Sequence, residues 1–585
     1  MKKYCTLFFA MILLSPFKMA KAEAPDTTQR IIVSSDIGGT DPDDFQSMVH
    51  LFVYADTFDI EGIISSPHGE GRATHILEVI DEYEKDYPKL VAYSSKYPTP
   101  DSLRSLVKQG ETEKAPPVGY RESTEGSDWI IECAKRDDPR PLHVLVWGGI
   151  EDLAQALHDA PEILPKLRVY YIGGPNKKHA PNAFQYIVEN FPDLWMIESN
   201  ATYRGWFTGG DQSGVWSNTG FVNKYVKGFG ALGDYFASKK AEVKMGDTPS
   251  LMRLFNGDPE DPTQPSWGGQ FVPAWERPHQ VFNRITTDQD SIDEFGILEL
   301  HLYFDPSTVT EPTAAMNIDG LALEAQVLDD TLRFLFCPKK AATWSYSFTS
   351  NIPSLSGLTG KLISAPTDPS LKDNPSPLYA HWWTDDPSPE YNEGGNIGAK
   401  TVNMWRVDFL TDFADRMYRC AYFPNTYFKM NTSATNGSIE MSVTDTAYLA
   451  GTEITLTAVP DSGYEFVQWT GDVSSTKSEI VITMNADKNI EAQFAEIVSV
   501  QSKINEGISV FPVKFKDFVT VTFPDDSQVS RSIEIFNISG HHLKTYRIEP
   551  DQDKIVINTS SLLDGVFILR IHNGSDILSQ TIIKN

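Results

Sequence analysis

The sequence predicts an α/β protein in which a mostly parallel sheet carries helices on both faces, with a β-rich insertion and two C-terminal all-β modules. Three observations lead to this class. From about residue 30 to 284, short apolar strands alternate with amphipathic helical patterns, as in a parallel sheet. Between 285 and 372 the alternation stops and strand patterns dominate. From about 425 the chain is rich in Thr, Ser and Asn and shows only strand patterns.

The first 22 residues have the pattern of a signal peptide. Lys2 and Lys3 form a basic start, an apolar core runs from Leu7 to Leu14, and Ala20-Lys21-Ala22 is a small-residue cleavage site. This core is too short to span a bilayer, and no later apolar run is long enough. We therefore expect an exported protein without a membrane span.

Charge and cysteine content exclude several partners and sites. The formal net charge of −29 argues against nucleic acid, a polyanion, and against an anionic membrane surface. Once Cys5 leaves with the signal peptide, Cys133, Cys337 and Cys420 remain. An odd number of widely spaced cysteines fits neither a zinc site nor a disulfide framework, so we expect buried thiols.

The α/β region starts with an apolar strand at 31–33, a loop, and a helical pattern from Phe45. No Gly-x-Gly-x-x-Gly opens this helix, which argues against a dinucleotide site. Further strands are expected at 59–64, 143–147, 167–172 and 194–197, and helices at 73–83 and 150–157.

The insertion is expected at 285–372, with strands at 301–304, 321–327 and 332–336. The helical pattern then resumes at 399–422 and closes the α/β domain, which therefore comprises 23–284 and 373–423. The apolar face of this closing helix is formed by Trp405, Phe409, Phe413 and Met417.

The loop between the first strand and the first helix carries four carboxylates, Asp36, Asp41, Asp43 and Asp44. It lies at the carboxyl end of a strand, where ligands bind in open α/β sheets. Carboxylates so close together repel one another, so a cation is their natural partner, and oxygen ligands suit Ca²⁺ or Mg²⁺.

Two other loop types are excluded, and one alternative stays open. If Asp36 is counted as position 1, an EF-hand would need Gly at position 6 and Glu at position 12, and neither is present. A phosphate loop would need a following Gly-Lys-Ser/Thr. The alternative is that Asp43 or Thr40 caps the helix while the other acids are solvated.

Residues 36–44, Asp-Ile-Gly-Gly-Thr-Asp-Pro-Asp-Asp, resemble the nucleoside hydrolase signature Asp-x-Asp-Pro-Gly-x-Asp-Asp. They are still more similar to the nucleoside-hydrolase-like family named after a cellulose-binding protein. Three further stretches agree with that family: the second strand end at 63–69, the turn at 144–154, and the strand end at 171–174. The resemblance covers about 30–284 and 375–423 and implies a nucleoside-hydrolase-like fold.

The resemblance also implies a metal site. In nucleoside hydrolases a tandem Asp pair, an earlier Asp and a late Asp hold Ca²⁺, which binds the ribose 2′- and 3′-hydroxyls and a water. Carried over to this chain, Asp43 is the base that takes a proton from the water. The metal ligands are then Asp36, Asp44, Asp247 and, through a main-chain carbonyl, Glu151. The implied ion is Ca²⁺, with Mg²⁺ as the alternative.

Substrate-binding residues are less clearly implied, because the family's Asn and Glu residues that hold the ribose 5′-hydroxyl have no clear match. Asn176, Asn182 and Gln185 are candidates, as are Asp41 and His68. His68 sits at the ligand edge and is, alternatively, a structural histidine at the strand end. Trp267 and Gln270 stand among glycines, which permits close approach of a flat ligand or, alternatively, a tight turn around a core Trp.

The two C-terminal modules resemble known repeat and sorting domains. Residues 425–495, through the run at 463–471, are similar to the divergent internalin-type β-repeat of bacterial surface proteins. Residues 500–585, with clear strands at 533–536 and 566–571, resemble the C-terminal sorting domain of type IX secretion. This resemblance implies passage through the periplasm, the type IX machinery as a partner, and release or surface attachment. The alternative is an ordinary β-sandwich adaptor.

Three functions fit these features. The first is a secreted, metal-dependent hydrolase of N-ribosyl or related glycosidic bonds, with a nucleoside or carbohydrate substrate. The second is a carbohydrate-binding protein that uses the same cation to hold sugar diols without turnover, and so has no need of Asp43 as a base. The third is a surface adhesin whose β modules make the contacts.

Overall fold

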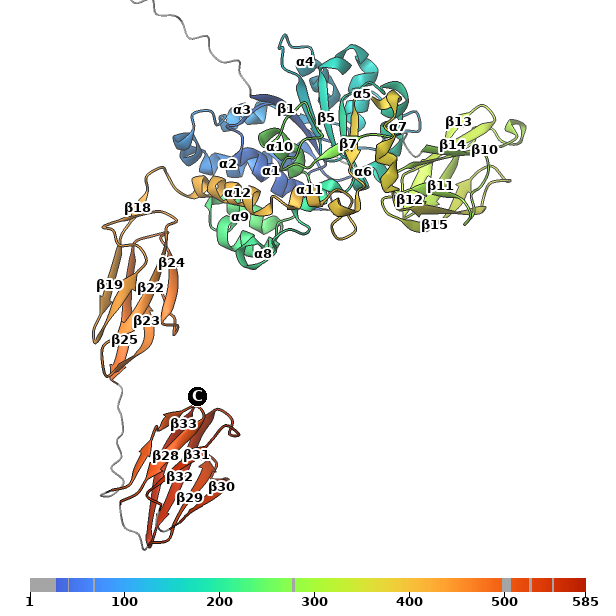
Figure 1. The fold of residues 1–585 in the computed structure, drawn as a ribbon. Coiled ribbons are helices and arrows are strands. Elements are labelled where there is room, and N and C mark those ends of the chain that lie inside the picture. Colours follow the sequence, from blue (N-terminus) through green and yellow to red (C-terminus); the bar gives the residue numbers. More distant parts are fainter. Residues whose placement is uncertain are drawn as a thin grey trace, which may run out of the picture. The chain divides into compact units, whose positions relative to one another are not determined.

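The structure is a computed structural model that describes residues 28–39, 41–66, 69–275, 279–496, 507–524, 529–549 and 552–585. The chain divides into two compact units, Met1–Tyr427 with Leu449–Gly451, and Phe428–Tyr448 with Thr452–Asn585. Helices and the large sheet lie in the first unit, and the second contains strands (Figure 1). The signal peptide expected at 1–22, and the residues Thr40 and His68, lie outside the described residues.

The first unit is built on an eight-stranded sheet with the order β3-β2-β1-β4-β5-β6-β17-β7. All neighbouring strands are parallel except β17 and β7, which confirms the mostly parallel sheet. β17 lies after the insertion in sequence and pairs with β6, so the chain returns to the sheet it left. The strands are β1 (Gln29–Ser35), β2 (Phe58–Ser65), β3 (Val107–Gln109), β4 (Leu142–Val146), β5 (Leu167–Ile172), β6 (Met196–Ser199), β7 (Phe271–Pro273) and β17 (Trp382–Asp385).

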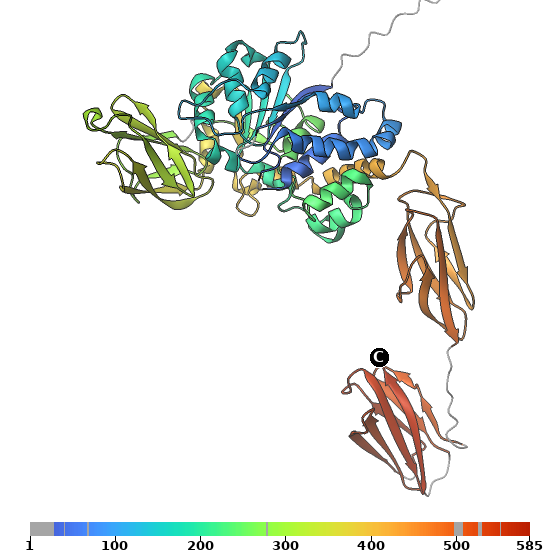
Figure 2. The same cartoon turned by 180° about the vertical axis from the view of Figure 1, so that it is seen from behind.

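Helices cover both faces of this sheet, as Figures 1 and 2 show from opposite sides. Successive side chains of a strand point to opposite faces. Accordingly Ile31 and Val33 of β1 join one hydrophobic core, and Ile32 joins the other. The main helices are α1 (Asp43–Val53), α2 (Ala73–Tyr93), α4 (Glu125–Ala134), α5 (Glu151–Asp159), α7 (Pro181–Asn190), α9 (Gly230–Lys239), α10 (Thr248–Phe255) and α12 (Arg406–Ala421).

The closing helix differs from the sequence prediction, because 399–422 forms two helices, α11 (Lys400–Asn403) and α12, instead of one. The break coincides with Arg406, a buried side chain that donates to the carbonyl oxygens of Trp206, Asp211 and Trp216. These tertiary hydrogen bonds leave no mark on helical periodicity. The predicted apolar face is buried at Phe409, Phe413 and Met417, whereas Trp405 is only partly buried.

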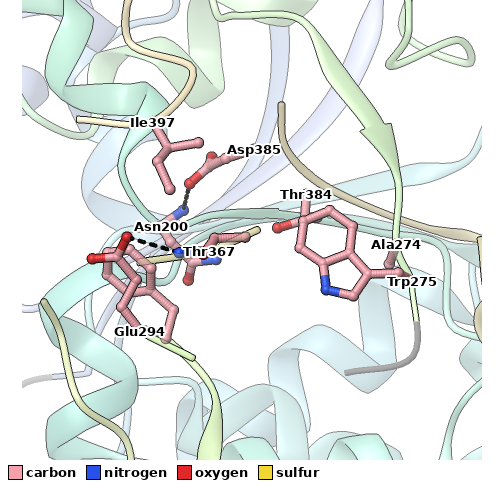
Figure 3. A pocket seen from close by; sticks show the side chains of 9 residues that line it. Asn200, Ala274, Trp275, Glu294, Thr367, Thr384, Asp385 and Ile397 are labelled. Atoms are coloured by element: carbon pink, nitrogen blue, oxygen red, sulfur yellow. Dashed lines mark hydrogen bonds between the residues drawn. The ribbon is translucent and has the colours of Figure 1, made fainter. Parts of the chain in front are cut away.

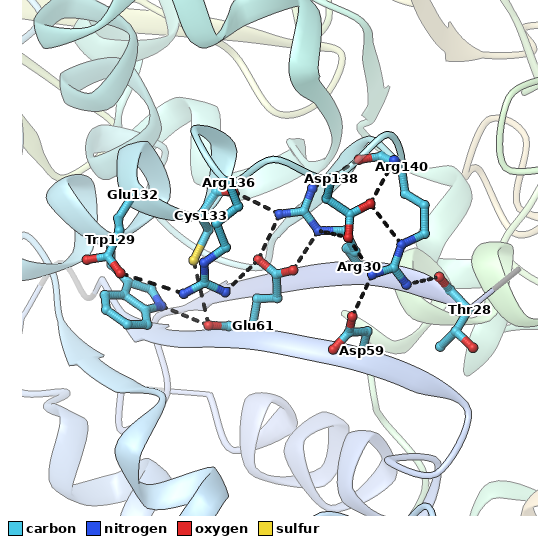
Figure 4. A network of polar contacts seen from close by, with 10 residues as sticks. All are labelled: Thr28, Arg30, Asp59, Glu61, Trp129, Glu132, Cys133, Arg136, Asp138 and Arg140. Atoms are coloured by element: carbon cyan, nitrogen blue, oxygen red, sulfur yellow. Dashed lines mark hydrogen bonds and ion pairs between the residues drawn. The ribbon is translucent and has the colours of Figure 1, made fainter. Parts of the chain in front are cut away.

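A network of polar contacts joins the amino-terminal part of β1 to β2 and α4 (Figure 4). The buried Arg30 donates to Glu61 Oε1 at 2.5 Å and to the Cys133 carbonyl oxygen at 2.8 Å. Arg136 reaches the other oxygen of Glu61 at 3.0 Å, and Arg140 reaches Asp59 at 2.9 Å. Every buried charge in this network therefore has a partner of opposite sign, which its burial requires. The network lies at the end of β1 that is away from the acidic loop.

The insertion is two packed sheets, with the orders β13-β14-β10-β8 and β12-β11-β15-β16-β9, around a core of its own. It contains more strands than predicted, and it starts at β8, before the expected boundary at 285. The expected strand 321–327 is two strands, interrupted at Ala325. The strands are β8 (His279–Phe282), β9 (Ser291–Asp293), β10 (Ile297–Tyr303), β11 (Ala314–Ile318), β12 (Leu321–Glu324), β13 (Gln326–Leu328), β14 (Thr331–Phe336), β15 (Ala342–Ser350) and β16 (Thr359–Ala365).

The second unit contains the two all-β modules, each with a separate hydrophobic core. The first module has two three-stranded sheets, β19-β25-β23 and β20-β22-β24, and the second has the sheets β26-β28-β31 and β27-β33-β32-β29-β30. The strands of the first module are β19 (Met430–Ala434), β20 (Gly437–Met441), β22 (Glu453–Pro460), β23 (Tyr464–Gly471), β24 (Glu479–Thr483) and β25 (Lys488–Glu496). Those of the second are β26 (Ser509–Phe511), β27 (Lys514–Phe515), β28 (Phe518–Thr522), β29 (Arg531–Asn537), β30 (His542–Ile548), β31 (Lys554–Asn558), β32 (Gly565–Asn573) and β33 (Asp576–Lys584).

Candidate functional site

The acidic loop leaves β1 in a tight turn, in which the amide of Gly39 donates to the carbonyl oxygen of Asp36 at 3.0 Å. Gly38 has φ +90°, and a Cβ there would lie 2.3 Å from the ring of His75, so only glycine fits. Ser35 then donates to Asp44 Oδ1 at 2.5 Å and so directs that carboxylate back toward the strand end.

The helix-capping alternative for Asp43 does not describe this loop. Pro42 is the N-cap of α1, and among the described residues no side chain makes a cap hydrogen bond there. Asp43 and Asp44 instead occupy the first turn, where the helix dipole favours negative charge.

Asp43, Asp44 and Asp247 come together at the carboxyl edge of the sheet, with one carboxylate oxygen of each within 4.8 Å of the others. Asp247 is the N-cap of α10 and is 4% exposed. Within the described part of the chain, its Oδ2 atom is buried and has no hydrogen-bond partner. A buried carboxylate oxygen without a donor, in a set of oxygen-only ligands, fits a bound Ca²⁺ or Mg²⁺.

Asp36 lies beside this cluster, against the end of β4. A Cβ on Gly148, which follows β4, would lie 2.5 Å from the Cβ of Asp36, so the glycine makes room for the carboxylate. Glu151 begins α5, and its side chain accepts from the amide of Ala115 at 3.4 Å. That side chain lines a small pocket with Asp152 and not the cavity of the acidic cluster.

The electrostatics of the cluster also favour a cation. Burial, and then the neighbouring carboxylates, raise the pKa values of Asp44 and Asp247 well above the ordinary Asp value. Burial and then the charge of Asp36 raise the pKa of Asp43 to about 6. Ionising all of these carboxyls is therefore costly unless a positive charge offsets their repulsion.

A divalent cation is expected to stabilise the protein more at pH 7 than at pH 4.5. Because the folded state holds these protons more tightly than the unfolded chain, the metal-free protein loses stability as pH rises from about 4 to above 6. For Asp43 alone, the rise in pKa from 3.8 to about 6 corresponds to about 3 kcal/mol. The difference between the melting temperature in Ca²⁺ and that in chelator should increase as pH rises. Equal metal-induced shifts at both pH values would contradict this site.

The acidic cluster lines a cavity of about 570 Å³. Two predicted substrate-binding residues, Asp41 and Asn176, also line it. Asp41 forms an ion pair with Lys244, and Asn176 donates to the carbonyl oxygens of Trp147 and Ile172 at 3.0 and 2.9 Å.

Four predicted substrate-binding residues do not line this cavity, and their own contacts explain why. Asn182 donates to the carbonyl oxygen of Ala115 at 3.1 Å and lines a neighbouring cavity, and Gln185 is buried and donates to Glu189 at 3.0 Å. Trp267 packs against Phe255, and the backbone amide of Gln270 donates to Thr401 Oγ1 at 3.2 Å. The amide of Gly269 donates to the carbonyl oxygen of Ser266 at 3.2 Å, so the glycines beside Trp267 form a tight turn.

Several residues of the cavity were missed by the sequence prediction. Tyr203 and Arg204 follow the end of β6, so the rule that ligands bind at the carboxyl ends of strands could have indicated them. Lys339 comes from the insertion, and no sequence pattern indicates its place. The other missed lining residues are Trp147, Ile172, Pro175, His179, Phe207, Thr208, Lys244 and Asn396.

A second, smaller cavity of about 40 Å³ lies between the sheet and the insertion (Figure 3). Its polar centre is Asp385 at the end of β17, which accepts from the amides of Asn200 and Ala201 at 3.0 and 2.7 Å. Burial raises the pKa of Asp385 to about 7. These hydrogen bonds fix the turn that follows β6 and leads to Tyr203 and Arg204.

A mostly parallel sheet with an acidic cluster at its carboxyl edge is the expected arrangement of a nucleoside-hydrolase-like domain. Comparison with family models agrees: residues 30–271 match "Cellulose-binding Sde182, nucleoside hydrolase-like domain". Residues 429–498 match "Divergent InlB B-repeat domain", and residues 509–585 match "Secretion system C-terminal sorting domain". All three resemblances seen in the sequence are thus confirmed.

The sorting domain identifies the protein as secreted or displayed at the cell surface by type IX secretion. In the described ranges of the chain, none of the helices combines the length and apolar character needed to cross a membrane.

Solved structures with similarity to the chain include a nucleoside hydrolase-related protein from Saccharophagus degradans that is associated with carbohydrate metabolism. It is 16% identical, with a TM-score of 0.41, over 95% of this chain and 98% of that one. The type III effector XopQ, complexed with adenosine diphosphate ribose, is 8% identical with a TM-score of 0.24, over 40% of this chain and 68% of that one. A comparison with curated proteins finds no match.

Proposed function

We propose that the protein is a secreted, metal-dependent hydrolase of N-ribosyl or related glycosidic bonds. The observation that supports this most is the group of Asp43, Asp44 and Asp247 at the cavity, with a buried Asp247 oxygen that has no donor among the described residues. Asp36, Asp44 and Asp247 would hold the ion, Ca²⁺ or Mg²⁺. When bound, the ion supplies a positive charge that orients vicinal sugar hydroxyls and makes a water more acidic.

Asp43 is suited to the role of general base. It is the one member of the three-carboxylate group that is only partly buried, and it lines the cavity. Asp44 is held by Ser35, and Asp247 is almost fully buried. Without metal the pKa of Asp43 is about 6, and a bound cation would lower it, so the carboxylate is ionised at neutral pH and able to accept a proton from water.

Two observations support a sugar as the ligand class of this cavity. Asn176 commits its amide hydrogens to two backbone carbonyls, which leaves its side-chain oxygen to accept from a hydroxyl. The family that matches residues 30–271 is named for a cellulose-binding protein, which favours a carbohydrate. The same name supports the second candidate, a carbohydrate-binding protein that holds sugar diols in this cavity without turnover.

Incubation of the purified protein with Ca²⁺ and a panel of nucleosides and plant or algal oligosaccharides tests both functions. We expect hydrolysis with Ca²⁺ and none after chelation, and none with Asp247→Asn, which keeps the shape of the side chain but removes a ligand charge. Calorimetric binding of a sugar without product would favour the second candidate. Neither product nor binding across the panel would contradict both.

A further inference from the structure

Two cationic side chains in the cavity have no acidic partner, although the chain as a whole is strongly acidic. Arg204 and Lys339 both line the cavity that contains the acidic cluster, and both are partly buried. Across the described residues, neither forms an ion pair. Lys244, the other lysine of this cavity, is paired with Asp41. The chain has 50 basic and 79 acidic residues, so unpaired cations facing one cavity need an explanation.

Arg204 is held in place by neutral groups. Its Nε atom donates to the Tyr203 hydroxyl at 3.2 Å, and Nη1 donates to Asn396 Oδ1 at 3.1 Å. Asn396 is itself fixed, because its amide donates to the Glu393 carbonyl at 3.0 Å in a turn with two positive-φ glycines. Asp385 also holds the turn that precedes Tyr203 and Arg204, because it accepts a hydrogen bond from the amide of Asn200 (Figure 3). The guanidinium is thus oriented in advance while its charge stays uncompensated, which lowers the entropic cost of binding an anion.

Lys339 is brought to the cavity by the contacts that attach the insertion. Lys177, which follows the cavity residue Asn176, forms a fully buried ion pair with Glu198 of β6. Lys177 also donates to the carbonyl oxygen of Phe295 at 2.9 Å. The amide of Phe295, at φ +61°, donates to the carbonyl oxygen of Pro338 at 2.7 Å, directly before Lys339. The positive φ of Phe295 is a strained conformation, and the hydrogen bond from the ion-paired Lys177 holds it. The backbone directly before Lys339 is therefore held in place.

We propose that the cavity selects sugars that carry an anionic group, a carboxylate or a phosphate, and that Arg204 and Lys339 bind this group. The proposal rests on the proposed sugar-binding function of the same cavity. Arg204 offers a planar pair of donors that matches a carboxylate or phosphate, and Lys339 adds a point charge. The competing role for both residues is to offset the charge of the acidic cluster.

Calorimetry with sugars that lack a glycosidic bond tests the proposal independently of turnover. At constant Ca²⁺, glucuronate is compared with glucose, and ribose 5-phosphate with ribose, so that the two arms separate a carboxylate from a phosphate. We expect at least one anionic sugar to bind about tenfold or more tightly than its neutral partner. Arg204→Gln and Lys339→Gln should each remove most of this preference. Lys340→Gln, next in sequence and exposed, should keep it.

Two outcomes would overturn the proposal. One is equal affinity for anionic and neutral sugars, or a preference that survives both substitutions. The other is a change in Ca²⁺ affinity without a change in sugar preference, which would assign Arg204 and Lys339 to charge balance. Thermal melts confirm that each variant folds. These measurements report binding of sugars that have no glycosidic bond to cleave. Absence of hydrolysis in the separate activity assay would therefore contradict the hydrolase function and leave this inference standing.

Discussion

Replacement of Asp43 by asparagine is expected to lower the rate of hydrolysis by about 10²–10⁴-fold while leaving the fold and the metal affinity intact. The amide has the size and shape of the carboxylate but cannot accept a proton from water. Asp43 is partly buried at the start of α1, so the substitution removes a charge without opening a cavity.

The comparison is made with Asp44→Asn and Asp408→Asn. Asp44 is 5% exposed and held by Ser35, so its variant should lose metal as well as activity. Asp408 occupies the first turn of α12 and is exposed, so its variant controls for loss of an acid at a helix start. Rates and calorimetric Ca²⁺ titrations are measured for all three. If Asp43→Asn hydrolyses substrate at the parental rate, Asp43 is not the base.

A second readout comes from the metal-free protein. At pH 7 a carboxyl with a pKa of about 6 is largely ionised, and that ionisation opposes folding. In chelator, Asp43→Asn should therefore melt at a higher temperature than the parent. A lower melting temperature would mean that contacts of the Asp43 side chain stabilise the fold by more than its ionisation destabilises it.

Phe413→Ala is expected to lower the free energy of unfolding of the first unit by about 3–5 kcal/mol. Phe413 is fully buried on α12, with ring centroids 4.8 Å from His50, 5.7 Å from Phe221 and 5.9 Å from Phe236. Truncation would leave a cavity between α12, α1 and α9. Val407→Ala on the same helix, where the side chain is 37% exposed, should change the free energy by less than about 0.5 kcal/mol.

Differential scanning calorimetry of the full chain provides the measurement, because the second unit does not contain α12 and serves as an internal reference. We expect the transition of the first unit to move to lower temperature and that of the second unit to stay. An unchanged first transition would show that the core tolerates the loss of this ring.

The sequence predicted the elements whose pattern is local. β5 has the predicted bounds, and the buried face of α12 has the predicted spacing. In β15, Trp344, Tyr346 and Phe348 alternate with more exposed Thr and Ser residues, a readable strand signal that the prediction did not use. The break before α12 was not readable, because the hydrogen bonds of Arg406 that accompany it reach residues about 190 to 200 positions away.

The candidate site was predictable only in part, for a similar reason. The acids of the loop at 36–44 are adjacent in sequence, and Asp247 was found through the family resemblance alone. The amides of Asn182 and Gln185 were candidates for the ligand because of residue type. Asn182 instead donates to Ala115, which is distant in sequence, and Gln185 donates to Glu189 within the same helix. Lys339 could not be placed without the contacts of the insertion.

The return of the chain to the sheet at β17 has a consequence for the order of folding. β6 pairs with β17, and the turn after β6 is held by Asp385, so the cavity wall that carries Arg204 is completed only after the whole insertion has been synthesised. Until then, one side of β6 presents unpaired backbone groups, which invite pairing with other chains. Contacts between segments so distant in sequence also form slowly. Until β17 is in place, the chain is therefore exposed to aggregation at this edge, and a chain truncated between β6 and β17 retains the open edge.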